Sequence, residues 1–270
     1  MSVPITAAGP GPELSDDQLL AAYAWDDDDD DGDDGVLPAG RPLFRFNFIT
    51  SVDGAATLDG RSGGLGDGAD RRVFGLLRRT ADVVLVGAGT VRAEGYAGEL
   101  LDAAGQSWRA AAGVPAHPGL AVVSGSLDLD PDSDLFREAP VRPLLLTSAA
   151  APADRRAALE RVADVVTAGE RSVEPEQAAR VLAERGFRRV LGEGGPQLFG
   201  AFQAAGLADE LCLTVSPLLT AGNATRITAG TPEIGPHRLE LVHVLRGGNT
   251  LLLRYRSRSG AGRAGVQHPG

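Results

Sequence analysis

Short hydrophobic runs separated by amphipathic segments organise the chain from residue 41 onward. The run Val83-Val84-Leu85-Val86 is apolar at four consecutive positions, which is typical of a strand buried on both faces. Similar runs predict further strands at 44–49, 120–124, 141–147, 165–167, 189–192 and 210–215. Apolar residues at helical spacing predict helices at 70–79, 152–163, 176–185 and 196–205, and a short helix near Trp108 within an irregular stretch, 94–118. This alternation predicts an α/β fold, with a mostly parallel sheet and flanking helices.

The two ends of the chain have different patterns. Two runs, 239–245 and 250–255, flank Gly247-Gly248-Asn249 and predict a C-terminal β-hairpin with antiparallel strands. Ser15 is a suitable N-cap for a short amphipathic helix that carries Leu19, Leu20, Tyr23 and Trp25 toward the main body. We expect disorder at 1–12, in the aspartate run 26–34 and at 258–270. The chain therefore divides into an acidic extension, 1–40, one domain, 41–257, and a tail, 258–270.

Charge is concentrated before Arg41. The formal net charge is −10, but eleven acids and no basic residue precede Arg41, so the remainder carries about +1. Neither part has the basic stripe of a nucleic-acid-binding protein. No apolar run has membrane-spanning length and no secretory signal is recognisable, so we expect no membrane association and a cytoplasmic location.

The reactive side chains exclude several kinds of chemistry. Cys212 is the only cysteine, which excludes an internal disulfide and a thiolate metal site, and its apolar surroundings predict a buried structural residue. The four histidines are scattered without metal-ligand spacing, so no metal site is expected. Every cation is an arginine, which excludes a Schiff-base lysine and a P-loop lysine.

Two glycine-rich turns follow predicted strands, at Gly87-Ala88-Gly89-Thr90 and at Glu193-Gly194-Gly195-Pro196. Glycine lets a ligand approach the backbone, and the second turn precedes a helix whose N-terminal amides favour anions. Either turn alone is equally consistent with an empty strand-to-helix connection. Together they indicate a dinucleotide pyrophosphate, and therefore a cofactor that brings its own reactivity.

Four ordered motifs carry a family resemblance. They are Asn47-x-x-x-Ser51-Val52-Asp53-Gly54, Asp70-Arg71-x-x-Phe74-x-x-Leu77-Arg78, Asp82-x-x-Leu85-Val86-Gly87-x-Gly89-Thr90-Val91 and Glu193-Gly194-Gly195-Pro196-x-Leu198-x-x-x-Phe202. With these, residues 43–256 resemble the reductase domain of the riboflavin-biosynthesis deaminase/reductase, a pyrimidine reductase of the dihydrofolate-reductase-like superfamily. The zinc motif of the family's deaminase half is missing, so the resemblance implies reduction alone.

The resemblance implies a homodimer that uses NADPH to reduce the first sugar carbon of a ribosylamino-pyrimidine phosphate, as in 5-amino-6-(5-phosphoribosylamino)uracil reductase. By matched position, the cofactor would contact Ile49, Gly87, Ala88, Gly89, Thr90, Gly194, Gly195, Pro196, Gln197, Leu198 and Phe199, with Thr147 and Ser148 at the adenosine 2′-phosphate. The substrate-side positions are Asn47, Asp53, Ser62, Asp70, Arg78 and Glu94, and Asp70 and Glu193 are the candidate catalytic residues.

Five of the candidate substrate-side and catalytic residues also have a structural interpretation. Arg78 could satisfy carbonyls at a helix end, Glu193 could cap the following helix, and Asp53 could form a turn. Ser62 could face solvent. Asp70 could be an N-cap, whereas in the wider superfamily a carboxylate on this helix binds the N–C–N edge of a pterin.

Departures from the family pattern leave the acceptor open. The family's riboflavin enzymes usually have lysine at the position of Asn47, and an Asp-Asp-Pro segment with a phosphate-binding arginine where this chain has Arg92-Ala93-Glu94-Gly95-Tyr96. The substrate therefore lacks the ribose phosphate or binds it through Arg92 or Arg109. Three hypotheses follow: a riboflavin-type pyrimidine reductase, a dihydrofolate or pterin reductase, and a non-catalytic nucleotide-binding dimer.

Overall fold

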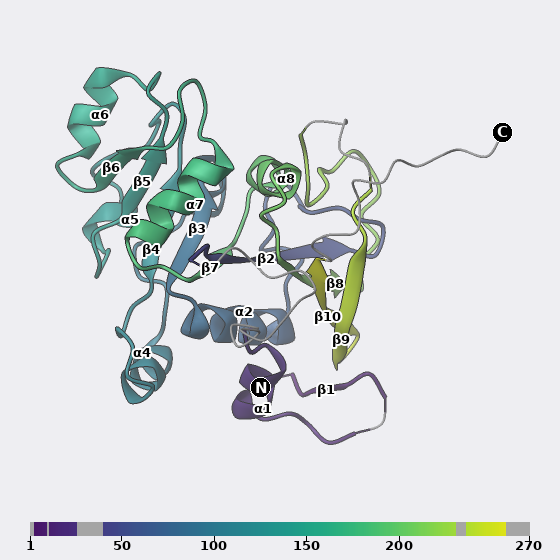
Figure 1. Cartoon of the computed structure of the whole chain (residues 1–270). Coiled ribbons are helices and arrows are strands. Elements are labelled where there is room, and N and C mark those ends of the chain that lie inside the picture. The colour runs from purple at the N-terminus through teal and green to yellow at the C-terminus, as the bar shows by residue number, and fades with distance from the viewer. Residues whose placement is uncertain (1–2, 10, 26–39, 231–235, 258–270) are drawn as a thin grey trace.

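The structure, a computed structural model, describes residues 3–9, 11–25, 40–230 and 236–257. Within these ranges one mixed sheet runs through the molecule in the order β1-β9-β10-β8-β2-β7-β3-β4-β5-β6 (Figure 1). Its strands are β1 (Ile5–Ala7), β2 (Leu43–Ser51), β3 (Val83–Gly87), β4 (Gly119–Val123), β5 (Leu144–Thr147), β6 (Asp164–Thr167), β7 (Arg189–Gly192), β8 (Glu210–Ser216), β9 (Leu239–Gly247) and β10 (Thr250–Ser257). The helices are α1 (Asp16–Ala22), α2 (Gly68–Thr80), α3 (Ala88–Glu94), α4 (Ala103–Ala111), α5 (Asp134–Arg137), α6 (Ala153–Leu159), α7 (Pro175–Glu184) and α8 (Pro196–Ala204).

The expected fold class is confirmed. Strands β8, β2, β7, β3, β4, β5 and β6 are mutually parallel, whereas β10 pairs antiparallel with β8 and β9. The β9–β10 hairpin turns at Gly248, whose φ of 62° suits glycine. Figure 1 shows helices on both faces of the parallel part, which explains why its strands are apolar on both sides.

The prediction of disorder at residues 1–12 is wrong in part. Ile5–Ala7 forms β1, which pairs antiparallel with β9 and covers that edge of the sheet. Three residues are too few for a recognisable strand pattern, so this pairing depends on β9. The aspartate run and residues 258–270 lie outside the described residues.

Alternate residues of the central strands enter two cores. In β3, Val84 and Val86 face the core that contains α1 and α2, whereas Val83 and Leu85 face the core beneath α7 and α8. On the second side, Gly192 must lack a side chain because a Cβ there would lie 2.4 Å from the ring of Phe46. Dense packing on both faces fixes the strand ends at which the site is built.

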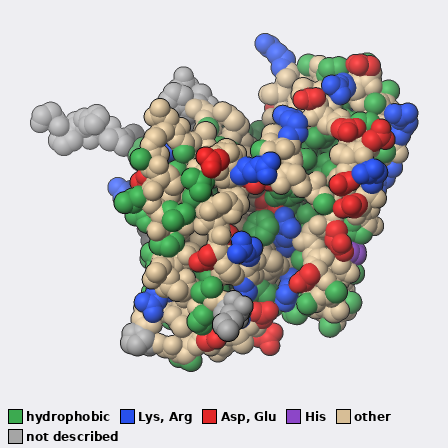
Figure 2. Space-filling model, turned by 180° about the vertical axis from the view of Figure 1, so that it is seen from behind, with side chains coloured by type: hydrophobic (Ala, Val, Ile, Leu, Met, Phe, Trp, Pro, Cys, Tyr) green, Lys and Arg blue, Asp and Glu red, His purple; other side chains and the backbone are tan. Residues whose placement is uncertain are grey.

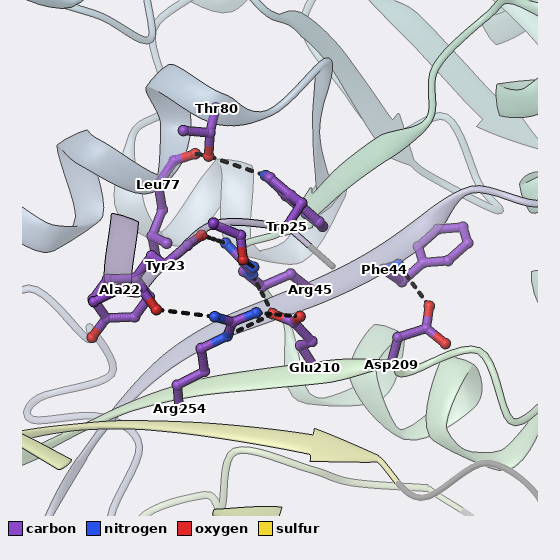
Figure 3. Close-up of polar contacts among 11 residues, drawn as sticks. Ala22, Tyr23, Trp25, Phe44, Arg45, Leu77, Thr80, Asp209, Glu210 and Arg254 are labelled. Atoms are coloured by element: carbon purple, nitrogen blue, oxygen red, sulfur yellow. Dashed lines mark hydrogen bonds and ion pairs between the residues drawn. The ribbon is translucent and has the colours of Figure 1, made fainter. Parts of the chain in front are cut away.

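The N-terminal segment is anchored through buried charges (Figure 3). Arg45 on β2 and Arg254 on β10 both bind Glu210, with Arg45 Nε 2.6 Å and Arg254 Nη2 2.7 Å from its carboxylate oxygens. The guanidiniums also donate to the carbonyls of Ala22, Tyr23 and Ala24, at the end of α1. Burial alone would raise the pKa of Glu210, but the two arginines outweigh burial and lower it.

Candidate active site

A cavity of about 1050 Å³ opens at the carboxyl ends of the parallel strands. Its walls come from β2, the start of α2, α3, the end of β4 and the start of α8. Figure 2 shows one face of the molecule hollowed between its two halves, with arginine side chains around the hollow. Ligands of open α/β sheets bind at strand ends of this kind, and the volume suits a ligand of dinucleotide size.

The two glycine turns lie against each other in this cavity. The amide of Gly87 donates to the carbonyl of Gly194 (2.9 Å), and the amide of Glu193 donates to the carbonyl of Leu85 (3.0 Å). A Cβ on Gly195 would lie 2.8 Å from the hydroxyl oxygen of Thr90. The absence of side chains therefore permits the close approach of the two turns at the ends of β3 and β7.

The first turn of α8 is open to an anion. Its N-cap is Gly195, which offers no side-chain hydrogen bond, and Pro196 stands at the first helical position. The following amides face the cavity without a side-chain cap from the described residues. Such a helix start favours phosphate by amide donation and by the helix dipole.

Glu193 and Arg78 form a buried ion pair at the cavity wall. Arg78 Nε and Nη2 donate to Glu193 Oε1 and Oε2, each at 2.7 Å. The hydroxyl of Tyr96 donates to Oε2 at 2.7 Å, and the Glu193 side chain is fully buried. Arg78 also donates to the carbonyl of Leu100. The pair unites the substrate-side candidates Arg78 and Glu193, and Glu193 does not act as the cap of α8.

Asp70 points into the cavity instead of capping its helix. The N-cap of α2 is Asp67, whose side chain accepts from the amides of Ala69 and Asp70. The carboxylate of Asp70 accepts a hydrogen bond from Thr214, and burial, with a smaller contribution from Asp67, raises its pKa. A desolvated carboxylate in a cleft is a candidate ligand-binding group.

Ser62 and Glu94 connect the glycine-rich loop to α3. The amide and hydroxyl of Ser62 donate to Glu94 Oε1 at 2.7 and 2.9 Å. Both residues line the cavity. Ser62 is partly buried and hydrogen-bonded to Glu94, so the solvent-exposed interpretation of Ser62 does not hold.

The cavity brings together most of the predicted site. The lining includes Asn47, Ile49, Ser62, Asp70, Arg78, Gly87, Ala88, Gly89, Thr90, Glu94, Glu193, Gly194, Gly195, Pro196, Gln197 and Leu198. Four predicted residues do not line it: Asp53, Thr147, Ser148 and Phe199.

These four have other positions in the fold. Asp53 is exposed, and its carboxylate accepts hydrogen bonds from the Ser51 hydroxyl and from the amides of Ala221 and Thr220, which lower its pKa to about 2. Thr147 and Ser148 are buried at the end of β5. The ring of Phe199 packs on Phe46 and Phe48 in the core.

Sequence reasoning missed several residues that line the cavity. Ser124, Gly125 and Ser126 follow β4, and the hydroxyl of Ser124 is buried without a partner among the described residues. Arg171, after β6, is exposed and makes no hydrogen bond or ion pair with the residues that the structure describes. The rule that ligands bind at strand ends could have found Ser124, but Arg171 lies in a loop without a motif.

The two arginines considered for a substrate phosphate differ in position. Arg109 is buried and donates to the carbonyls of Arg79, Ala81 and Pro115, so it is a structural residue away from the cavity. Arg92 lines the cavity and donates to the carbonyl of Asp128 at 2.8 Å. Of the two, Arg92 alone could reach a ligand.

Two kinds of feature are absent from the described residues. Among the described residues, no group of three histidine, cysteine or carboxylate side chains is placed to hold a metal ion. The same part of the chain contains no helix long and apolar enough to cross a membrane.

The fold and the cavity define an α/β protein with a cavity of dinucleotide size at its strand ends, and comparison with known proteins identifies its family. Residues 42–253 match the RibD C-terminal domain, so the chain belongs to that family, as its motifs predict. Two relatives are named as reductases of a ribosylamino-pyrimidinone 5′-phosphate, which supports an oxidoreductase, and a reductase of this family implies a nicotinamide cofactor.

The relatives cover most of the chain. The chain is 31% identical over 221 residues to the 2,5-diamino-6-ribosylamino-4(3H)-pyrimidinone 5′-phosphate reductase of Methanothermobacter thermautotrophicus, covering 80% of this chain and 98% of that protein. It is 30% identical over 189 residues to the riboflavin biosynthesis protein RibD of Mycobacterium tuberculosis, covering 70% of this chain and 46% of that protein. A solved structure of a pyrimidine reductase-like protein from Corynebacterium diphtheriae matches with a TM-score of 0.74 and 29% identity, over 82% of this chain and 95% of that one.

Proposed function

We propose that this protein is an NADPH-dependent reductase of a ribosylamino-pyrimidine, with 2,5-diamino-6-ribosylamino-4(3H)-pyrimidinone 5′-phosphate as the favoured acceptor. One observation carries the proposal. The two glycine turns, the Asp70 carboxylate and the Arg78–Glu193 pair all line the same cavity. Relatives that match over nearly their whole length are named for this pyrimidinone.

The residues at the strand ends suit a dinucleotide. The uncapped start of α8 and the Gly87–Thr90 turn would hold the pyrophosphate, and Ser124 lines the same cavity at the end of β4. When bound, the nicotinamide supplies the hydride. The protein's own contribution is to hold the acceptor carbon close to it and to exclude water.

Arg171 supports NADPH over NADH. It is a cation with no protein partner in the described part of the chain, and it lines the cavity with Ser126. A guanidinium can bind a 2′-phosphate through two parallel hydrogen bonds. This assignment replaces Thr147 and Ser148 as the residues proposed to contact that phosphate.

Asp70 supports the 2-amino pyrimidinone as acceptor. A 2-aminopyrimidinone presents two donors, its 2-amino group and ring N3–H, and an ionised carboxylate accepts both. A uracil presents a carbonyl oxygen in place of the amino group, which would face the carboxylate unfavourably. Pterins share the donor edge, so a pterin reductase is the second candidate, and the same assay tests it.

The decisive experiment follows NADPH oxidation by the purified chain with three acceptors: the 2,5-diaminopyrimidinone phosphate, its 2-oxo (uracil) counterpart and dihydrofolate. We expect the highest kcat/KM with the diaminopyrimidinone. In the same assay NADPH should outperform NADH, and Arg171→Ala should raise the KM for NADPH about tenfold while leaving that for NADH nearly unchanged.

Other outcomes favour the other hypotheses. Higher kcat/KM with the uracil would assign the enzyme to that acceptor, and turnover of dihydrofolate alone would make it a pterin reductase. NADPH binding without reduction of any acceptor would favour a non-catalytic nucleotide-binding protein.

A further inference from the structure

Tyr96 connects three walls of the cavity through one buried carboxylate. Its hydroxyl donates to Glu193 Oε2 at 2.7 Å, while Arg78 binds both oxygens of the same carboxylate. These residues come from the segment after α3, the loop after β7 and α2, respectively. Tyr96 lies in the segment that departs from the family's pattern, and its role is separate from those proposed above.

A turn of the backbone at Gly95 precedes Tyr96, which lines the cavity. Gly95 ends α3 in the left-handed region, with φ of 70°, which glycine adopts without strain. The amides of Gly95 and Tyr96 both donate to the carbonyl of Val91, at 3.1 and 3.2 Å. This tight turn reverses the chain and fixes the direction of the Tyr96 side chain.

The Glu193 carboxylate depends on its three donors. Because its side chain is fully buried, a carboxylate lone pair that loses its donor stays desolvated, and without the Tyr96 hydroxyl only Arg78 would still donate to Oε2. Burial, with the neighbouring charge of Glu193, raises the pKa of the Tyr96 hydroxyl well above its usual value. The phenol therefore stays protonated at neutral pH and serves as a permanent donor.

Glu193 in turn sets the beginning of the cofactor turn. Its amide is bonded to Leu85, and the next residue, Gly194, accepts from the amide of Gly87. Gly194 and Gly195 both pack against Thr90. A change in the position of the Glu193 side chain would therefore move the glycine backbone that faces the proposed pyrophosphate.

We propose that Tyr96 is a positioning residue for the cofactor: its hydroxyl holds the Glu193 carboxylate so that the Gly194–Gly195 turn is preformed for NADPH. This inference rests on the proposed function for the identity of the cofactor. It requires no acceptor, because it concerns the binding of NADPH alone.

The test is a double-mutant cycle read by NADPH titration, using energy transfer from protein fluorescence to the nicotinamide. The variants are Tyr96→Phe, Glu193→Gln and the double variant, with Tyr255→Phe on β10 as a matched control. We expect Tyr96→Phe to weaken NADPH binding about fivefold to tenfold, which is less than the full value of a hydrogen bond to a charged group, because the hydroxyl acts on the cofactor only through Glu193. Because the hydroxyl acts through Glu193, the double variant should bind no more weakly than Glu193→Gln alone. Tyr255→Phe should bind within about twofold of the wild type.

The inference would be overturned if Tyr96→Phe bound NADPH as tightly as the wild type. It would also be overturned if the fold-loss of affinity in the double variant equalled the product of the two single losses. A lower melting temperature with unchanged affinity would make Tyr96 purely structural and would also overturn it. If Tyr96→Phe does not fold, Arg78→Lys replaces it in the cycle, with the same expected loss and with wild-type affinity as the contrary result. Wild-type protein that does not bind NADPH would refute the proposed function instead.

Discussion

The carboxylate of Asp70 differs from the other buried carboxylate of the cavity in its partners. Glu193 is neutralised by Arg78, whereas the hydrogen-bond partner of Asp70 is the neutral hydroxyl of Thr214. Asp70 therefore retains acceptor capacity for a ligand. Its burial without a guanidinium partner is unfavourable for the free protein, which is common at sites selected for binding.

Asp70→Asn is expected to change acceptor preference. The KM for the 2,5-diaminopyrimidinone should rise about tenfold to a hundredfold, since a hydrogen bond to a charged group contributes about 1.5–3 kcal/mol. The KM for the uracil counterpart should change less than threefold. Steady-state kinetics with both acceptors check this, and equal losses for the two would contradict the role of Asp70.

The same residue should impose a pH dependence. Because burial raises the pKa of Asp70, its carboxyl protonates at a higher pH than an ordinary aspartate as the pH falls. The KM for the diaminopyrimidinone should therefore rise as the pH decreases through this pKa, and the rise should be absent in Asp70→Asn. A carboxyl whose pKa is raised on folding lowers stability above that pKa, so this variant should be at least as stable as wild type at neutral pH.

At the scale of elements, α1 and the residues after it are attached to the sheet by specific polar contacts. The centroid of the Trp25 ring lies 4.1 Å from the guanidinium carbon of Arg45. The indole Nε1 of Trp25 donates to the Thr80 hydroxyl at 3.1 Å (Figure 3). Arg72 of α2 donates to Asp16 at 2.8 Å. The segment therefore supports α2, which carries Asp70 and Arg78.

Trp25→Ala is expected to lower the free energy of unfolding by about 3 kcal/mol, through lost burial and the lost contact with Arg45. Urea denaturation followed by circular dichroism measures this. Trp108→Ala on α4, where the indole is only half-buried, is the control and should cost less. Equal stability of Trp25→Ala and wild type would show that this packing does not contribute in solution.

At the scale of the molecule, one face of the β9–β10 hairpin exposes several leucines beside Arg246. Leu241 pairs with Tyr255, Val244 with Leu253 and Arg246 with Leu251, so these side chains share one side of the sheet. Leu239, Leu241 and Leu251 are exposed by 43%, 50% and 38%. An apolar surface of this kind is typical of a protein interface. We propose it as the contact of the homodimer that the family resemblance implies.

Leu241→Asp should shift the protein from dimer to monomer, because each subunit would bury an unpaired charge at the interface. Sedimentation velocity at micromolar concentration measures the change. Val114→Asp, at a residue of 38% exposure after α4, is the matched control and should remain dimeric. A monomeric wild type, or a Leu241→Asp dimer, would contradict this interface.

The sequence by itself determined the central architecture. Continuous apolar strands, amphipathic helices and glycine turns have fixed local causes, so the parallel sheet, the hairpin and the two halves of the cofactor turn followed from local pattern. Position-by-position resemblance then placed sixteen predicted residues on the cavity lining. The resemblance also assigned Thr147 and Ser148 to the cofactor, but both are buried outside the cavity lining, because whether a strand-end hydroxyl is open or buried depends on the neighbouring loops.

The tertiary structure alone decided which groups meet. Glu193 binds Arg78 and Tyr96. Glu210 binds Arg45 and Arg254. These partners are far apart in the sequence, so local spacing does not reveal the pairs. The pairing of β1 likewise depends on β9, more than two hundred residues away. Desolvation gives these contacts their energetic importance, and burial is a property of the assembled fold. For that reason the site's charge pairing, and with it the role proposed for Tyr96, emerged only in three dimensions.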